Sequence, residues 1–144
     1  MKRCLQRIER RHIYICNERN INYFIRKYDI NTYNEMNYYE YIKDTLNEMK
    51  NIDGIFASIY LIAAQVIQVC NELNIKILSD VKLFGFDDVE IAKLTTSTIT
   101  TIHQAIKEIA RLAIELIDAK YKNIEVNEQT ILPIELVVRN SFKE

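Results

Sequence analysis

Hydrophobic positions along the first part of the chain alternate between short apolar runs and amphipathic stretches. Strand-like runs cover residues 11–16, 29–32, 54–57 and 81–86. Between them, apolar residues recur three and four positions apart over 18–28, 38–50 and 58–73, which is the spacing of one helix face, and Asn37 can cap the second of these helices. This β-α-β-α-β-α-β order predicts an α/β fold with a parallel sheet and right-handed crossovers.

The rhythm changes after residue 86. Residues 98–102 are β-branched and extended in pattern, and residues 103–119 form a long amphipathic helix with apolar side chains at three- and four-residue steps. A final strand is predicted over 130–138, with Pro133 inside it. Because proline lacks the N–H that a sheet ladder needs, this strand is expected at an edge or at a bend.

The predicted helix over 58–73 is apolar around most of its circumference. A helix that covers a sheet needs only one apolar stripe. Two interpretations follow: a crowded core helix, or a helix whose second apolar face is buried against another subunit.

Composition limits the class of protein. A length of 144 residues suits one domain, and a net charge of −1 gives the chain as a whole no electrostatic attraction to nucleic acid. No apolar run approaches the ~20 residues that span a bilayer, and the N-terminus lacks the apolar core of a secretory signal. We therefore expect a cytoplasmic protein, with Cys4, Cys16 and Cys70 as free thiols.

No pattern in the chain indicates catalysis. His103 has no acid or nucleophile at a recognisable motif spacing, paired Cys/His spacings for zinc are absent, and Gly54 and Gly85 are isolated rather than part of a phosphate loop. The basic residues between 2 and 11 fit a solvated terminal helix better than a DNA-binding unit. The sequence thus predicts a protein that is not an enzyme and has no metal or cofactor.

The segment Val81–Asp88 gives the strongest functional indication. Its apolar strand pattern ends in a glycine, an aromatic residue and two acids. In open parallel sheets, ligands bind at the carboxyl edge of the strands, where these acids are expected.

Four segments, in order, resemble the effector-binding domain of the lactose/galactose repressor (LacI/GalR) family of transcription regulators. Residues 53–63 are similar to that family's D-x-I-F-x-x-N-D-x-x-A turn, and residues 81–88 to its acid-ended strand. Residues 94–104 are similar to its L-T-T-[VI]-x-Q segment, and residues 132–141 to its L-P-x-x-L-x-x-R-x-S ending. A weaker likeness upstream, over 19–23 and 32–39, extends the resemblance over nearly the whole chain.

The resemblance implies a three-layer parallel-sheet lobe of a type I periplasmic-binding-protein-like domain. Residues 1–144 would form a single domain, namely the C-terminal subdomain plus the helix that in the family returns to the first lobe. The DNA-binding head and almost all of the first lobe would be missing. Helix 103–119 would then need another partner for its apolar face, through intrachain refolding, a swapped dimer or disorder.

The function implied is effector sensing and dimerisation in a regulator. The partners would be a small sugar-like or purine-like effector and a second copy of the chain. DNA would be reached only through the missing N-terminal helix-turn-helix, and no membrane is involved.

Carried over position by position, the resemblance implies four ligand-binding positions: Arg19, Tyr33, Asp87 and Ile59. Arg19 matches an arginine that grips effector hydroxyls or a carboxylate, and it can equally be a surface residue. Tyr33 matches an aromatic residue that stacks on the effector, and it also fits a half-buried strand tyrosine. Asp87 matches an acid that accepts bonds from effector hydroxyls, with a helix cap for 89–94 as the alternative.

Ile59 departs from the family pattern, because an asparagine whose amide binds the effector is common at this position. A truncated or degenerate paralogue, acting only as a dimerisation module without ligand, is therefore the alternative function. A third hypothesis is an extracytoplasmic sugar-binding protein of related fold, against which the absence of a signal sequence argues.

Overall fold

The computed structural model describes residues 13–27, 37–49, 51–89, 97–127 and 129–143. The chain divides into two compact units, Met1–Glu35 and Met36–Glu144. None of the helices in the described ranges is long and apolar enough to cross a membrane.

In the first unit, the strand predicted over 11–16 is wrong, because residues 13–18 are helical. Cys16 is buried and Ile13 half-buried, whereas Tyr14 and Ile15 are exposed, which is a helical and not an alternating pattern. Asn20 ends the helix in a left-handed conformation, with φ of 51°. The predicted helix over 18–28 is therefore also wrong, since residues 21–27 have no regular structure; the strand predicted over 29–32 lies outside the described residues.

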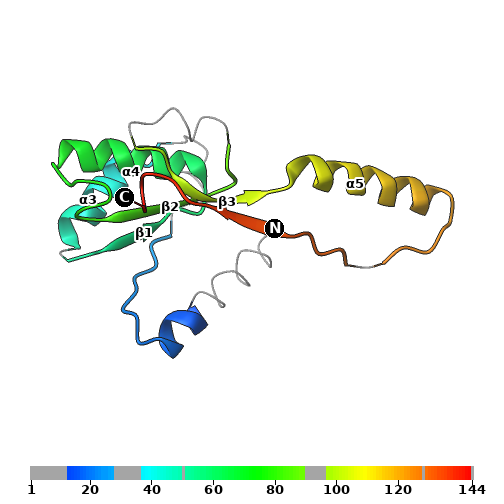
Figure 1. Cartoon of the computed structure of the whole chain (residues 1–144), viewed down its shortest axis with the longest axis horizontal. Coiled ribbons are helices and arrows are strands. Elements are labelled where there is room, and N and C mark those ends of the chain that lie inside the picture. The colour runs from blue at the N-terminus through cyan, green and yellow to red at the C-terminus, as the bar shows by residue number, and fades with distance from the viewer. Residues whose placement is uncertain (1–12, 28–36, 50, 90–96, 128, 144) are drawn as a thin grey trace. The chain divides into compact units, whose positions relative to one another are not determined.

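The second unit is built on a four-stranded sheet, shown in Figure 1. Its strands are β1 (Gly54–Phe56), β2 (Lys82–Phe86), β3 (Thr100–Gln104) and β4 (Ile134–Val137), in the order β1-β2-β3-β4. The first three run parallel and β4 is antiparallel to β3. The α/β class is thus confirmed, and so is an edge position for the last strand, with Pro133 directly before it.

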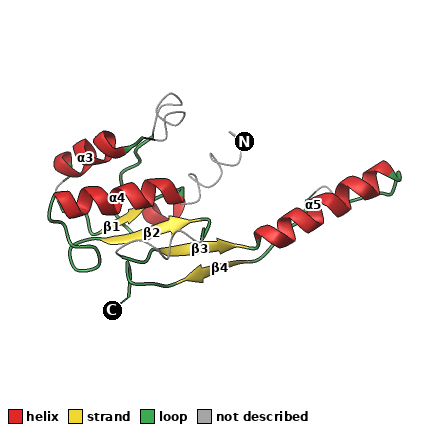
Figure 2. Cartoon of the chain, turned by 90° about the horizontal axis from the view of Figure 1, so that it is seen from above, coloured by secondary structure: helices red, strands yellow, loops and turns green. Residues whose placement is uncertain are grey.

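Two helices pack against each other on one side of this sheet (Figure 2). Helix α4 (Tyr60–Glu72) follows β1 and packs on β2, and α3 (Tyr39–Glu48) packs on α4. The backbone N–H of Tyr38 donates to Oε1 of Gln65 at 2.8 Å, which ties the start of α3 to α4. Asn37 Oδ1 accepts a bond from the backbone N–H of Tyr39 at 3.3 Å, but the N-cap position is Tyr38, one residue later than predicted, so the predicted cap at Asn37 is wrong.

This layering resolves the two interpretations of the apolar helix. Six side chains of α4 are buried within the chain: Ile62, Ala63, Val66, Ile67, Val69 and Cys70. The sheet covers one face of α4 and α3 covers another, so the interpretation as a core helix is confirmed. Gly85 leaves room on the sheet side for the side chain of Ile99, because a Cβ atom there would lie 3.1 Å from Ile99 Cγ2, whereas its 3.8 Å distance to Ala63 of α4 would be ordinary contact.

The segment after β4 completes the sheet at the amino ends of β2 and β3. Ser141 is fully buried between them. Its Oγ donates to the carbonyl of Leu83 at 2.6 Å and accepts from the N–H of Thr100 at 2.7 Å. Its backbone N–H donates to Thr98 at 3.0 Å, and its carbonyl accepts from the N–H of Leu83 at 3.1 Å. One serine therefore satisfies backbone groups of both strands.

Helix α5 (Ile106–Tyr121) begins where β3 ends (Figure 2), and none of its residues is buried. One of its faces lines a groove of about 340 Å³ together with residues 130–134. The helix predicted over 103–119 is present, but it begins three residues later than predicted, because His103 and Gln104 belong to β3. Contact with residues 130–134 shields part of its apolar surface.

We expect Ser141→Ala to lower the free energy of unfolding by about 2–4 kcal/mol. The change leaves a buried carbonyl at Leu83 and a buried N–H at Thr100 without their partner, and each unsatisfied group costs about 1–3 kcal/mol. Urea denaturation followed by circular dichroism measures the change.

The matched control is Ser79→Ala, because the Ser79 hydroxyl is exposed and bonds only to the neighbouring Asp80 at 3.1 Å. This variant should stay within about 0.5 kcal/mol of the unmodified chain. Equal effects of the two substitutions would contradict the bridging role of Ser141.

Candidate functional site

The carboxyl ends of β1, β2 and β3 meet at one edge of the sheet, because these neighbouring strands are parallel. The residues that follow them are Ile59 after β1 and the Asp87–Asp88 pair after β2, while β3 ends at Gln104 itself. This is the edge at which open α/β sheets bind ligands.

Asp87 and Asp88 both adopt positive φ angles, of 87° and 47°. Such angles are uncommon outside glycine, although aspartate tolerates them better than most residues. They persist where surrounding contacts hold them. Here the N–H of Asp87 donates to the carbonyl of Ile102 at 3.2 Å, and the N–H of Asp88 donates to Oγ1 of Thr101 at 3.4 Å. The turn is therefore fastened to β3.

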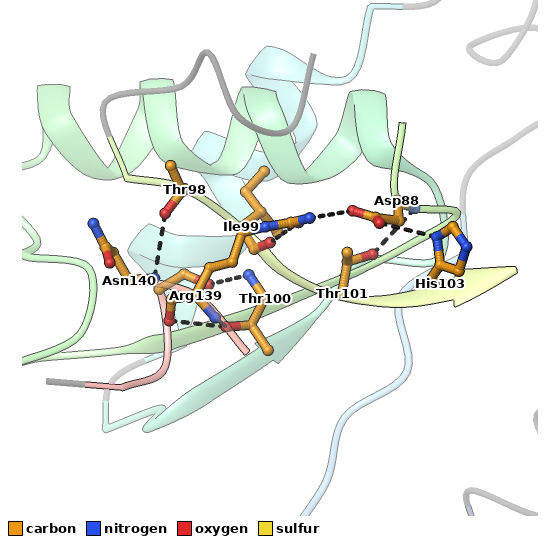
Figure 3. Close-up of polar contacts among 9 residues, drawn as sticks. Asp88, Thr98, Ile99, Thr100, Thr101, His103, Arg139 and Asn140 are labelled. Carbon is orange, nitrogen blue, oxygen red and sulfur yellow. Dashed lines mark hydrogen bonds and ion pairs between the residues drawn. The ribbon is translucent and has the colours of Figure 1, made fainter. Parts of the chain in front are cut away.

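The carboxylate of Asp88 anchors this turn from a second direction, as Figure 3 shows. Its Oδ1 accepts a bond from Nη2 of Arg139 at 2.5 Å, and its Oδ2 lies 3.0 Å from Nδ1 of His103. The Asp88 and Arg139 side chains are 11% and 14% exposed, so solvent screens this ion pair weakly.

Arg139 is itself fixed by β3. Its N–H donates to Oγ1 of Thr100 at 2.8 Å, and the same hydroxyl donates back to the carbonyl of Arg139 at 3.0 Å. Its Nη1 donates to the carbonyl of Ile99 at 2.8 Å. The guanidinium therefore spans from the last segment of the chain to the turn after β2 (Figure 3).

Asp87 has a different environment from Asp88. Its Oδ1 accepts a bond from the side-chain amide of Gln104 at 2.6 Å, and Asp87 is only half-buried. A carboxylate has about four acceptor positions, so this bond leaves acceptor capacity for hydroxyl groups of a ligand. Asp88 is committed to holding the turn, whereas Asp87 presents a positioned carboxylate at the sheet edge.

The structure places the four predicted ligand-binding residues as follows. Asp87 and Ile59 lie at the same edge, with Ile59 half-buried in extended conformation at the start of α4, without a side-chain hydrogen bond to cap that helix. Arg19 is exposed in the turn after residues 13–18 and belongs to the first unit, so its role as a ligand contact stays a prediction. Tyr33 lies outside the described residues.

Sequence reasoning gave no role to Asp88, His103, Gln104 or Arg139. His103 has no acid at a motif spacing in the sequence, but the fold brings Asp88 to it from the end of the neighbouring strand. Gln104 and Arg139 both stand in the segments that carry the family resemblance. Their position in those motifs could have marked them as site residues, but the sequence does not show that they bind Asp87 and Asp88.

The side chains at the carboxyl edge of the sheet are suited to hydrogen bonding with a ligand. No group of three or more metal-ligating side chains exists among the described residues. Cys70 belongs to α4 and is buried, and burial raises the pKa of its thiol to about 11, so it stays protonated near neutral pH. The edge offers a carboxylate, an amide and an imidazole, which are groups that recognise polar ligands.

Comparison with known proteins places the chain in a family. Residues 5–142 match the family described as periplasmic binding protein-like domain. The helix-turn-helix-type transcriptional regulator MalR of Clostridium butyricum is 30% identical over 109 residues, which cover 76% of this chain and 32% of MalR. The chain spans about a third of the length of the curated relatives it matches.

Solved structures agree. A LacI family transcriptional regulator from Arthrobacter sp. FB24, in complex with lactose, superposes with a TM-score of 0.65 at 26% identity, over 72% of this chain and 40% of that one. The transcription regulator CcpA of Lactococcus lactis has the same fold, with a TM-score of 0.76 at 18% identity, over 92% of this chain and 48% of that one. The chain therefore belongs to the family of periplasmic binding protein-like domains, in the form found in the lactose/galactose repressor family of transcription regulators.

Proposed function

We propose that the chain is the effector-sensing and dimerisation portion of a LacI/GalR-type transcription regulator, with Asp87 as a contact for a small sugar-like effector. The observation that carries the proposal is the fixed carboxylate of Asp87, held by Gln104 on a turn that Asp88 and Arg139 anchor. A site that is already in place before the ligand arrives loses less conformational entropy on binding.

The polar edge matches the chemistry of a sugar. Sugar hydroxyls donate hydrogen bonds, and a carboxylate such as Asp87 accepts several of them. A neighbouring amide such as Gln104 can both donate and accept. The lactose-bound relative from Arthrobacter supports a carbohydrate as the class of effector to test first.

The relatives reported above are named as regulators, and from this we infer a binding rather than a catalytic role. A cytoplasmic location follows from the proposal, because a regulator of transcription acts where the chromosome is. Contact with DNA would need a separate helix-turn-helix unit.

A second candidate function is association without ligand binding. It is favoured by Ile59, because an aliphatic side chain at the sheet edge gives a ligand no hydrogen bond. The two candidates differ in one measurement, namely whether any sugar or purine binds.

We expect Asp87→Asn to weaken sugar binding by about ten-fold or more, since a hydrogen bond to a charged group is worth about 1.5–3 kcal/mol. Isothermal titration calorimetry with lactose, sucrose, ribose and hypoxanthine measures the affinity. Asparagine keeps an oxygen for Gln104 and tolerates the positive φ, so the turn should be preserved.

The matched control is Asp53→Asn, an exposed acid that precedes β1 at the opposite edge of the sheet, which should bind as the unmodified chain does. Unchanged affinity in Asp87→Asn would remove Asp87 as a contact. No heat of binding and no thermal shift with any of the four ligands would select the association-only function.

We expect Ile59→Asn to tighten sugar binding by about two- to ten-fold, the value of one neutral hydrogen bond of about 0.5–1.5 kcal/mol. The extended backbone of Ile59 suits an asparagine, whose side chain can also cap α4. Calorimetry compares this variant with Ile59→Val, which adds no polar group and should leave the affinity unchanged. Equal affinities of both variants would show that position 59 does not face the ligand.

A further inference from the structure

His103 is the one histidine among the residues that the structure describes, and it lies at the carboxyl edge of the sheet. Its Nδ1 lies 3.0 Å from Oδ2 of Asp88, as Figure 3 shows. The side chain of His103 is 47% exposed, whereas that of Asp88 is 11% exposed. Water therefore reaches the imidazole much more readily than the carboxylate that it contacts.

The turn after β2 contacts the end of β3 on both faces. Successive side chains of a strand point to opposite faces, so Thr101 and His103 share one face of β3 and Gln104 lies on the other. Asp88 contacts the first face, with its N–H at Thr101 and its carboxylate at His103. Asp87 binds Gln104 on the second face. Because the two acids are adjacent in the chain, whatever holds Asp88 against His103 also holds the carboxylate of Asp87 in place.

The contact with Asp88 determines where protons sit on the imidazole of His103. An ionised carboxylate only accepts hydrogen bonds, so Nδ1 of His103 is the donor to Oδ2 of Asp88. In the neutral ring, Nε2 then carries no proton, and it is the atom that gains one as the pH falls. Uptake of this proton leaves the bond to Asp88 in place. The bond becomes stronger, because both of its partners are then charged.

The charged groups around His103 are mostly acidic. Glu135 of β4 is its direct partner in the antiparallel ladder, and side chains paired in this way share a face. Arg139 is the cation nearest in the network, and it binds the other oxygen of Asp88. A proton on His103 therefore balances two carboxylates with two cations. Three further charged residues lie in the adjoining elements: Asp87 on the other face of β3, and Lys107 and Glu108 in the first turn of α5.

We propose that His103 is a positioning residue of the effector site, which on taking up a proton fixes the turn that carries Asp87 and so raises the affinity for the effector. The inference rests on the proposed role of Asp87 as an effector contact. Asp87 and Asp88 have positive φ angles, and such angles persist only where surrounding contacts hold them. Apparent affinity scales with the fraction of molecules in the binding conformation. A stronger bond between Asp88 and His103 increases that fraction.

The affinity for the effector is therefore expected to rise as the pH falls from about 8.5 to about 5.5. Histidine changes charge in this range, whereas an ordinary aspartate stays ionised. Solvent screens an ion pair whose cation is half exposed, so the expected gain in affinity is about two- to five-fold.

The first test is calorimetry with lactose, sucrose, ribose and hypoxanthine on the whole chain across this pH range. His103→Gln keeps a side-chain N–H for Asp88 but cannot take up a proton, so it should show the weaker, alkaline affinity at every pH. His103→Lys carries a permanent charge in this range and should show the tighter, acid affinity at every pH. The matched control is His12→Gln, which removes the chain's other histidine and should keep the pH dependence of the unmodified chain.

The second test needs no ligand. Amide hydrogen exchange, followed by NMR, measures the protection of the Asp87 N–H, which donates to the carbonyl of Ile102 at 3.2 Å. After correction for the intrinsic exchange rate at each pH, this protection should rise about two- to five-fold on acidification, with the same midpoint as the ring signals of His103. The rise should be absent from His103→Gln and His103→Lys, and present in His12→Gln.

The outcomes separate this inference from the proposed function. Binding of a sugar with equal affinity at acid and alkaline pH would overturn the inference alone, and so would protection of the Asp87 N–H that does not follow the titration of His103. A pH dependence that survives in both His103 variants would assign it to another group and overturn the inference as well. Absence of binding by all four ligands at every pH would overturn the proposed effector site, and with it the role of His103 in affinity.

Discussion

The rest of the second unit depends on how the chain's last described segment joins two strands that precede it. Where β2 and β3 begin, Ser141 lies between them and supplies the bonds that each strand needs. Two residues earlier, Arg139 binds Thr100 and Ile99 and reaches Asp88 at the far end of β2. One short segment thus determines both the closure of the sheet and the geometry of the turn at the carboxyl end of β2.

The elements of the second unit were predictable because each has a strong local pattern. Residues 38–50 have apolar side chains at helical spacing over several turns, and residues 61–73 are apolar over a length that suits a helix, so both helices could be identified. β2 is an apolar run bounded by polar residues, and β4 was placed at an edge because of Pro133. The strand predicted over residues 11–16 was wrong because this segment is too short to show a clear pattern. Over six residues, apolar side chains at Ile13 and Cys16 fit a helix as well as a strand. Asn20 marks the end of the helix by its positive φ, which the sequence does not show.

The candidate site was predictable only in part, since its pairings are long-range. The Asp87–Asp88 pair was correctly expected at the carboxyl edge of the parallel strands, where ligand binding stays a proposal. Nothing local to Asp88 indicates its bond to Arg139, which is 51 positions away, or its contact with His103 on the next strand. Such partners are set by the strand register, in which Phe86 lies beside Ile102. The sequence therefore indicated that two acids lie at this edge of the sheet. Only the fold shows that Asp88 holds the turn and that Asp87 presents its carboxylate.

The position of Ser141 in the chain also has a consequence for the order of synthesis. Its partner Leu83 precedes it by 58 residues, so the ribosome releases β1, β2 and β3 well before the residue that joins them. Until then, the carbonyl of Leu83 and the N–H of Thr100 have water as their partner, and the loop to be closed between the strand and Ser141 is long. Contacts of such high sequence separation slow folding. During translation β2 and β3 would therefore lack the bonds of Ser141 at Leu83 and Thr100 until the last described segment is made, and the closure of this end of the sheet would be a late event.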